Sequence, residues 1–167
     1  MNNNVVYTAI YGDKNLLLSP FVISENFDYI CFTDNKKLRS VPVINTSGRE
    51  SGKSWKIIYY PSKFKSHRKS AKIFKILPHI FLKQYSFSIW VDGSFQMVGN
   101  LNGFKEFIQS KYNFGPIYNF NHSVRSSCYD EANRCIELKK GDAFKIKNQV
   151  LAYKSKGFCG SNNGKIY

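Results

Sequence analysis

The chain has 167 residues, of which 43% are apolar and 16% aromatic, and it carries a formal net charge of +14. This length suits one domain with a core of its own, and this composition excludes a disordered segment. No apolar run is long enough to cross a bilayer, and residues 1–4 lack the basic and apolar regions of a secretory signal. We therefore predict a single domain over residues 1–167, located in the cytoplasm.

Strands and helices alternate along the chain. Continuous apolar and β-branched runs predict strands buried on both faces, at residues 5–10, 28–33, 56–60 and 89–92. Apolar residues at helical spacing predict helices at residues 68–77, 103–111, 129–138 and 144–156, with Pro78 interrupting the first of them. This order predicts an α/β fold with an open, mainly parallel, twisted sheet flanked by helices.

Three polar clusters follow predicted strands, at the carboxyl ends where open parallel sheets bind ligands. The clusters are Tyr11-Gly12-Asp13, Thr33-Asp34-Asn35 and Asp92-Gly93-Ser94. The third is the most informative, because a carboxylate after a buried strand and before a glycine is a common ligand or metal site. Each cluster alone is also explained as a turn, but their coincidence at three strand ends favours a site.

Positive charge is concentrated near these clusters. Residues 36–83 contain 13 lysines and arginines and a single acid, Glu50. Such a field favours an anionic partner, namely a nucleoside diphosphate, a nucleic acid or an anionic membrane surface. Ordinary solvation accounts equally well for most of the individual lysines.

Two of the cations stand out because they share a face of a predicted helix. Arg68 and Lys72 are four residues apart, and together they would hold a diphosphate. A solvated helix face is the alternative for both. We expect Lys36 and Lys37, by contrast, to be solvated and to contribute little to diphosphate binding.

Two familiar site motifs are not present. The four cysteines form no Cys-x-x-Cys pair, which argues against zinc and predicts reduced thiols. Residues 48–54 look like a phosphate-binding P-loop, but three residues separate the glycines where four are needed. A strand-like run follows this segment in place of a helix, so we interpret it as a polar surface loop.

The order of motifs along nearly the whole chain matches a known family. The matching segments are residues 6–12, 28–35 and 55–57, Arg68-x-x-Ala71-Lys72, residues 75–79 and 89–93, His122-x-x-Arg125, Cys128-Tyr129-x-Glu131-Ala132, Gln149, Tyr153, Gly157 and residues 162–164. On these motifs the chain resembles the glycosyltransferase-like domains long catalogued as a domain of unknown function. They occur in bacteria, large viruses and plants, and their plant members include mucilage-related proteins.

The resemblance implies the nucleotide-sugar-binding α/β fold of the A-type glycosyltransferases. In that fold, Tyr11, Gly12, Asp13 and Asp34 would hold the nucleobase and ribose of a donor. The usual Asp-x-Asp motif of the fold binds a divalent metal, Mn²⁺ or Mg²⁺, against the diphosphate. The matching triplet here begins with Asp92, which is therefore the candidate metal ligand.

This chain departs from the implied metal motif at Ser94, which stands where the second carboxylate belongs. The resemblance therefore leaves metal binding open. Arg68 and Lys72 would supply part of the positive charge instead.

The resemblance also implies roles further along the chain. Asp92, His122 and Glu131 are its catalytic candidates, and Arg125 would line the donor cleft beside His122. On the acceptor side the candidates are Gln149, Asn162 and Asn163. Relatives continue beyond this last motif, whereas this sequence ends at Tyr167, so we expect a minimal transferase, a truncated form or a binding remnant.

We predict a hexosyltransferase-like enzyme of polysaccharide biosynthesis, using a UDP- or GDP-linked donor and a glycan or lipid-linked acceptor, with peripheral contact to an anionic membrane. The alternative is a non-catalytic basic module for nucleic acid or an acidic surface. In such a module, the aromatic residues among the lysines of residues 59–65 would stack on single strands. Asp92 favours the transferase, because nucleic-acid binding gives no reason for a carboxylate at the ligand edge of the sheet.

Overall fold

The computed structural model of the chain describes residues 3–14, 16–41, 43–44, 50–51, 55–111 and 127–159. The elements in chain order are β1 (Asn4–Ile10), β2 (Leu16–Leu18), β3 (Phe27–Thr33), β4 (Arg39–Val41), β5 (Val43–Ile44), β6 (Glu50–Ser51), β7 (Lys56–Tyr59), α1 (His67–Ile76), α2 (Pro78–Phe81), β8 (Phe87–Trp90), α3 (Phe104–Lys111), α4 (Cys128–Glu137) and α5 (Ala143–Ser155). All the predicted strands and helices are present, with ends within two residues of those expected.

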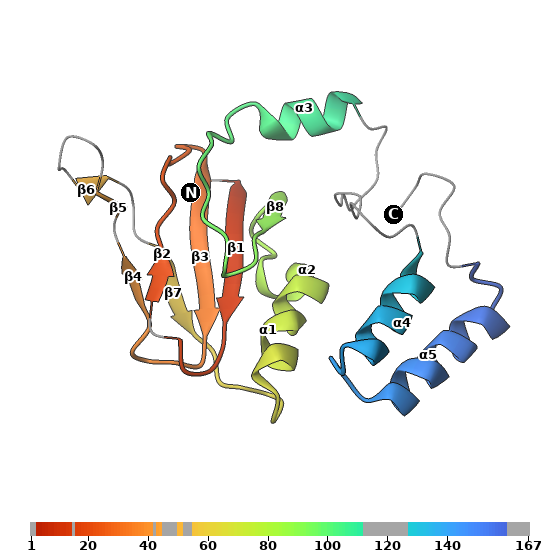
Figure 1. Cartoon of the computed structure of the whole chain (residues 1–167). Helices are drawn as coiled ribbons and strands as arrows, with labels where there is room; N and C mark the ends of the chain where they lie inside the picture. Colours follow the sequence, from red (N-terminus) through yellow and green to blue (C-terminus); the bar gives the residue numbers. More distant parts are fainter. Residues whose placement is uncertain are drawn as a thin grey trace. The chain divides into compact units, whose positions relative to one another are not determined.

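The central sheet has four parallel strands in the order β7-β3-β1-β8, which confirms the predicted open parallel sheet. β1 and β3 pair along their whole length, from Asn4 opposite Phe27 to Ile10 opposite Thr33. The chain passes from β7 at one edge to β8 at the other through α1 and α2 (Figure 1). Strand order therefore reverses at β1, and reversal points of this kind are where open α/β sheets bind ligands.

Alternate side chains of the two central strands fill a separate core on each face of the sheet. One core is completed by Leu17 of β2, by Leu38 and Trp55, and by partly buried residues of the segment that follows β8. The other is completed by Phe74 of α1 and Leu82 just after α2. Both faces are thus covered, as the continuous apolar runs predicted.

α1 is fixed to the sheet at two points. Phe74 is fully buried and stacks on Phe32 of β3, with ring centroids 4.2 Å apart and an interplanar angle of 12°. The buried Ser70 hydroxyl lies 2.7 Å from the hydroxyl of Ser62 and accepts a hydrogen bond from the backbone N–H of Phe64. These contacts hold the loop before α1 and so set the position of the first residue of this helix, His67.

The chain divides into two compact units, residues 1–111 and residues 112–167. The described part of the second unit is a pair of helices in contact, α4 and α5. Ser127 and Asp142 cap their amino ends by accepting backbone N–H groups with their side chains. None of the helices in the described ranges is long and apolar enough to cross a membrane.

Candidate donor-binding site

Three strands of the sheet end at the same level. The register places Ile10 opposite Thr33 and Thr33 opposite Tyr59, so the loops after β1, β3 and β7 leave the sheet side by side. β8 stops earlier, because its last residue, Trp90, lies opposite Tyr7 of β1. Asp92 therefore lies two residues beyond the strand rather than at its last position.

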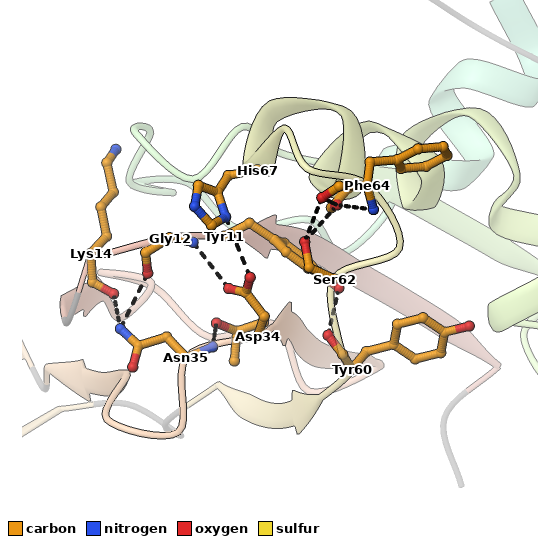
Figure 2. A network of polar contacts seen from close by, with 11 residues as sticks. Tyr11, Gly12, Lys14, Asp34, Asn35, Tyr60, Ser62, Phe64 and His67 are labelled. Atoms are coloured by element: carbon orange, nitrogen blue, oxygen red, sulfur yellow. Dashed lines mark hydrogen bonds and ion pairs between the residues drawn. The ribbon is translucent and has the colours of Figure 1, made fainter.

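The loop after β1 is tied to the end of β3 through Asp34. The backbone N–H of Gly12 donates to Oδ1 of Asp34 at 3.0 Å, as Figure 2 shows. Gly12 has a φ of +90°, and a Cβ added there would lie 3.3 Å from the imidazole ring of His67. The loop therefore requires glycine both for its conformation and for the close approach of α1.

Asn35 forms a second link between the two loops. Its Nδ2 donates to the carbonyl oxygens of Gly12 and Lys14, at 3.3 and 2.9 Å (Figure 2). Its Oδ1 accepts from the backbone N–H of Lys37 at 2.9 Å. Asn35 was part of a predicted cluster but had no predicted role, and in the structure it holds the two loops together.

His67, the first residue of α1, completes this arrangement. Its Nδ1 lies 3.4 Å from Oδ2 of Asp34, while the other carboxylate oxygen holds Gly12 (Figure 2). The Asp34 side chain is only 15% exposed, whereas that of His67 is 61% exposed. The predicted helix began one residue later, so His67 was not predicted as a site residue. The sequence signal that could have indicated His67 as a site residue was its place at the start of a helix that follows a strand.

Tyr11 is held on the inner side of the same loop. Its hydroxyl donates to the carbonyl oxygen of Tyr60 at 2.9 Å, which links the loop after β1 to the end of β7. Burial raises the pKa of Tyr11 well above its usual value, and the negative charge of Asp34 adds to this effect. Tyr11 is therefore a neutral hydrogen-bond donor that supports the loop.

The loop after β1, the loop after β3 and the start of α1 form the walls of an open cavity of about 490 Å³. The residues that line it are Gly12, Asp13, Asp34, Asn35, Lys36, Lys37 and His67. Three of the predicted donor-binding residues thus line a single cavity, together with two lysines and a histidine. Its volume lies in the range of sites that take small molecules.

Asp92 lies on the other side of β1, beside β8. Its Oδ1 accepts a hydrogen bond from the indole N–H of Trp90 at 3.0 Å, and its carbonyl oxygen accepts from the N–H of Phe95. The ammonium group of Lys75 lies 5.8 Å from the centre of the Trp90 ring. The backbone bond to Phe95 is that of a turn, so the turn interpretation of this cluster is correct for the main chain, while the carboxylate is oriented by Trp90.

Gly93 permits a close approach, as predicted, but the approaching group belongs to the protein. A Cβ at this position would lie 2.7 Å from Cγ1 of Ile10, a separation that side chains do not tolerate. Gly93 thus lets the segment after β8 pack directly on β1.

Comparison with known families identifies the chain. Residues 1–166 match the model of the TOD1/MUCI70 glycosyltransferase-like domain. The chain belongs to this family. No curated protein and no solved structure matches it. Family membership confirms the resemblance found in the sequence and assigns a glycosyltransferase-type function, with a sugar donor and an acceptor as its general partners.

Within this TOD1/MUCI70 domain, the cations are arranged differently from the expectation. The cavity is lined by Lys36 and Lys37, which we expected to be solvated and unimportant. Arg68 and Lys72 lie on α1 with exposed side chains and are not among the cavity-lining residues. Lys36 and Lys37 directly follow the cluster at the end of β3. This adjacency was the sequence signal that could have predicted them as cavity residues.

The remaining predicted residues belong to the second unit. Glu131 lies on α4, where its Oε1 is 3.6 Å from the thiol sulfur of Cys135. Gln149 lies on α5 and donates from its amide to the hydroxyl of Tyr153 at 2.7 Å. Four further predicted residues lie outside the described ranges, namely His122, Arg125, Asn162 and Asn163.

Proposed function

We propose that this chain is a glycosyltransferase that moves a sugar from a nucleoside-diphosphate donor to a glycan or lipid-linked acceptor. The observation that carries the proposal is the cavity at the carboxyl edge of the parallel sheet in a glycosyltransferase-like domain. Its lining combines two carboxylates with two lysines and a histidine. Carboxylates suit the hydroxyl and amine groups of a nucleoside, and lysines suit phosphate oxygens.

Asp34 and Asp13 are the proposed contacts of the nucleoside. Oδ1 of Asp34 accepts the backbone N–H of Gly12, and each carboxylate oxygen has two lone pairs. A ribose hydroxyl could therefore bind Asp34 without displacing the loop. Asp13 lies in the same cavity with an exposed side chain.

Asp92 is the proposed contact of the donor diphosphate, at the point where strand order reverses. Trp90 binds Oδ1, so Oδ2 would be the oxygen that contacts the donor or a cation. A single carboxylate fits a divalent cation when substrate phosphates complete the coordination. Asp92 would hold Mn²⁺ or Mg²⁺ in this way, and the cation would offset charge on the leaving diphosphate.

The proposed acceptor-side residues follow from the family resemblance. Glu131 is proposed to act beside His122 and Arg125, and Gln149 to contact the acceptor. On α5, the side chain of Gln149 is exposed.

A thermal-shift screen tests the donor class. UDP and GDP, each with and without Mn²⁺, should raise the melting temperature. A ligand at about a hundred times its dissociation constant adds roughly 2.7 kcal/mol of stability. If single-stranded oligonucleotides stabilise the protein and no nucleoside diphosphate does, the chain is a basic binding module and the transferase proposal is wrong.

Asp92→Asn tests the role of the carboxylate. Asparagine keeps the volume, the turn and an acceptor for Trp90, so the melting temperature should stay close to that of the wild type. Donor hydrolysis and sugar transfer should be lost, because the negative charge is gone. The matched control is Asp28→Asn, since the Asp28 carboxylate binds the hydroxyl of Tyr85 at the start of β3. Wild-type turnover by Asp92→Asn would reduce Asp92 to a turn residue.

A further inference from the structure

The outward face of α1 carries lysines and an exposed isoleucine. Ser70 and Phe74 are buried, and helical periodicity places Lys69, Lys72 and Ile76 on the opposite side. All three side chains are exposed, and that of Ile76 is 69% exposed. Most of the apolar surface of Ile76 is therefore in contact with solvent.

Exposed apolar and basic side chains also follow in α2 and just after it. Leu77 is both the C-cap of α1 and the N-cap of α2. Ile80 of α2 is 48% exposed, and Lys83 just after this helix is also exposed. We refer to Lys69, Lys72, Ile76, Ile80 and Lys83 as the α1–α2 surface.

Acidic side chains are missing from the sequence around this surface. The sequence has no aspartate or glutamate between residues 51 and 91, a stretch that contains nine lysines and arginines. The positive charge of α1 and α2 is therefore not neutralised from within their own segment. It is complementary to an extended anionic surface.

The exposed isoleucines decide between the anionic surfaces that lysines alone would fit. Phosphate contacts on nucleic acid use cationic and polar groups and leave an aliphatic side chain in water. At a bilayer surface, aliphatic side chains enter the boundary between headgroups and acyl chains, while lysines extend to the phosphates. We propose that the α1–α2 surface binds the face of a bilayer that contains anionic lipids. The proposal does not depend on sugar transfer and would stand if the chain proved inactive.

Co-sedimentation of the full chain with vesicles tests this surface. Vesicles of phosphatidylcholine mixed with phosphatidylserine should bind the protein, and vesicles of phosphatidylcholine alone should bind it much less. Each lysine near an anionic surface contributes about fivefold to partitioning. Lys69→Ala/Lys83→Ala should therefore lower binding roughly 25-fold, and added salt should weaken the wild type in the same direction.

The role of the two exposed isoleucines in membrane binding is tested with a closely matched control. Ile76→Ser/Ile80→Ser should lower vesicle binding on the order of tenfold or more, because both side chains lose their place below the headgroups. Leu16→Ser/Leu18→Ser changes two side chains of similar exposure, 65% and 51%, on β2 of the same unit. It should leave binding unchanged. All four positions are exposed, so melting temperatures should report intact folds.

Several outcomes would overturn the proposal. They are failure of the wild type to bind anionic vesicles, equal loss in the isoleucine and leucine variants, and full binding by the lysine variant. Preferential binding of single-stranded RNA over the vesicles, with no effect of the isoleucine changes, would assign the surface to nucleic acid instead.

Discussion

The carboxylate of Asp34 connects three parts of the site. One oxygen accepts the N–H of Gly12, the other lies 3.4 Å from His67, and the side chain remains partly accessible in the cavity. A ligand that binds Asp34 would therefore act on a loop and a helix end together. Gly12 is the most constrained point of this arrangement, because a Cβ there would lie 3.3 Å from the His67 ring.

Gly12→Ala should destabilise the protein by about 1–2 kcal/mol, since alanine resists a positive φ. The new Cβ would also press on the His67 ring. Chemical denaturation measures the change. Gly99→Ala is the control, because a Cβ at Gly99 meets nothing within 4 Å, and its stability should be unchanged or slightly raised. Equal effects at the two glycines would show that the Gly12 loop is not constrained as described.

Lys36 and Lys37 should matter more for nucleotide binding than Arg68 and Lys72. The first pair lines the cavity, so each lysine can form a charge-assisted hydrogen bond with a phosphate, worth about 1.5–3 kcal/mol. Lys36→Ala/Lys37→Ala should weaken UDP or GDP binding at least tenfold in calorimetric titration, and Arg68→Ala/Lys72→Ala less. The sequence alone predicted the opposite order. If the α1 pair has the larger effect, the diphosphate lies along the helix and not in the cavity.

At the scale of elements, α1 links the core to the site. Its buried face packs on β3 through Phe74, and its first residue contacts the loop after β1. Phe74 also contacts Phe81 and Tyr60, with ring centroids 4.5 and 5.4 Å apart. The aromatic cluster therefore fixes both the angle of the helix and the end of β7.

Phe74→Ala should lower the free energy of unfolding by about 3–5 kcal/mol, the range for large cavities in packed cores. Phe95→Ala is the matched control, because Phe95 is 64% exposed and its loss should cost well under 1 kcal/mol. Urea denaturation compares them. Should Phe74→Ala not fold, Phe74→Leu keeps most of the volume and should show a smaller loss of the same sign. A mild effect of Phe74→Ala would mean that α1 is held mainly by its loop.

The sequence predicted the main elements well, because the central strands are apolar on both faces and the helices are not. It missed β2 and β4, since three-residue strands such as Leu16–Leu18 are too short to show a period. It found Gly12, Asp13 and Asp34 because strand ends are readable from the pattern. It missed His67 and the lysines of the cavity, because their role depends on how far a loop and a helix reach across the edge of the sheet.

At the scale of the whole molecule, charge and burial act on different groups. No lysine or arginine is buried in the part of the chain that the structure describes, and the net charge of +14 sets how the protein meets anionic partners. The core holds ionisable groups in their neutral forms. Burial raises the pKa of Tyr7 to about 12 and that of Cys31 to about 12, from 10.0 and 9.0. Folding is therefore coupled to the protonation of these two groups at alkaline pH.

Stability should therefore fall as pH rises from about 10 to 12. In this range Tyr7 is ionised in the unfolded chain, whereas the folded protein keeps its proton, so the unfolded state is favoured. Each pH unit should remove about 1.4 kcal/mol for this one group. Denaturant titrations at successive pH values measure the slope, and Tyr7→Phe should make it shallower by that amount above pH 10. Between pH 7 and 9 the difference in stability between variant and wild type should be constant, because Tyr7 is protonated in both states there. Parallel slopes above pH 10 would show that the Tyr7 hydroxyl ionises as readily in the fold as outside it.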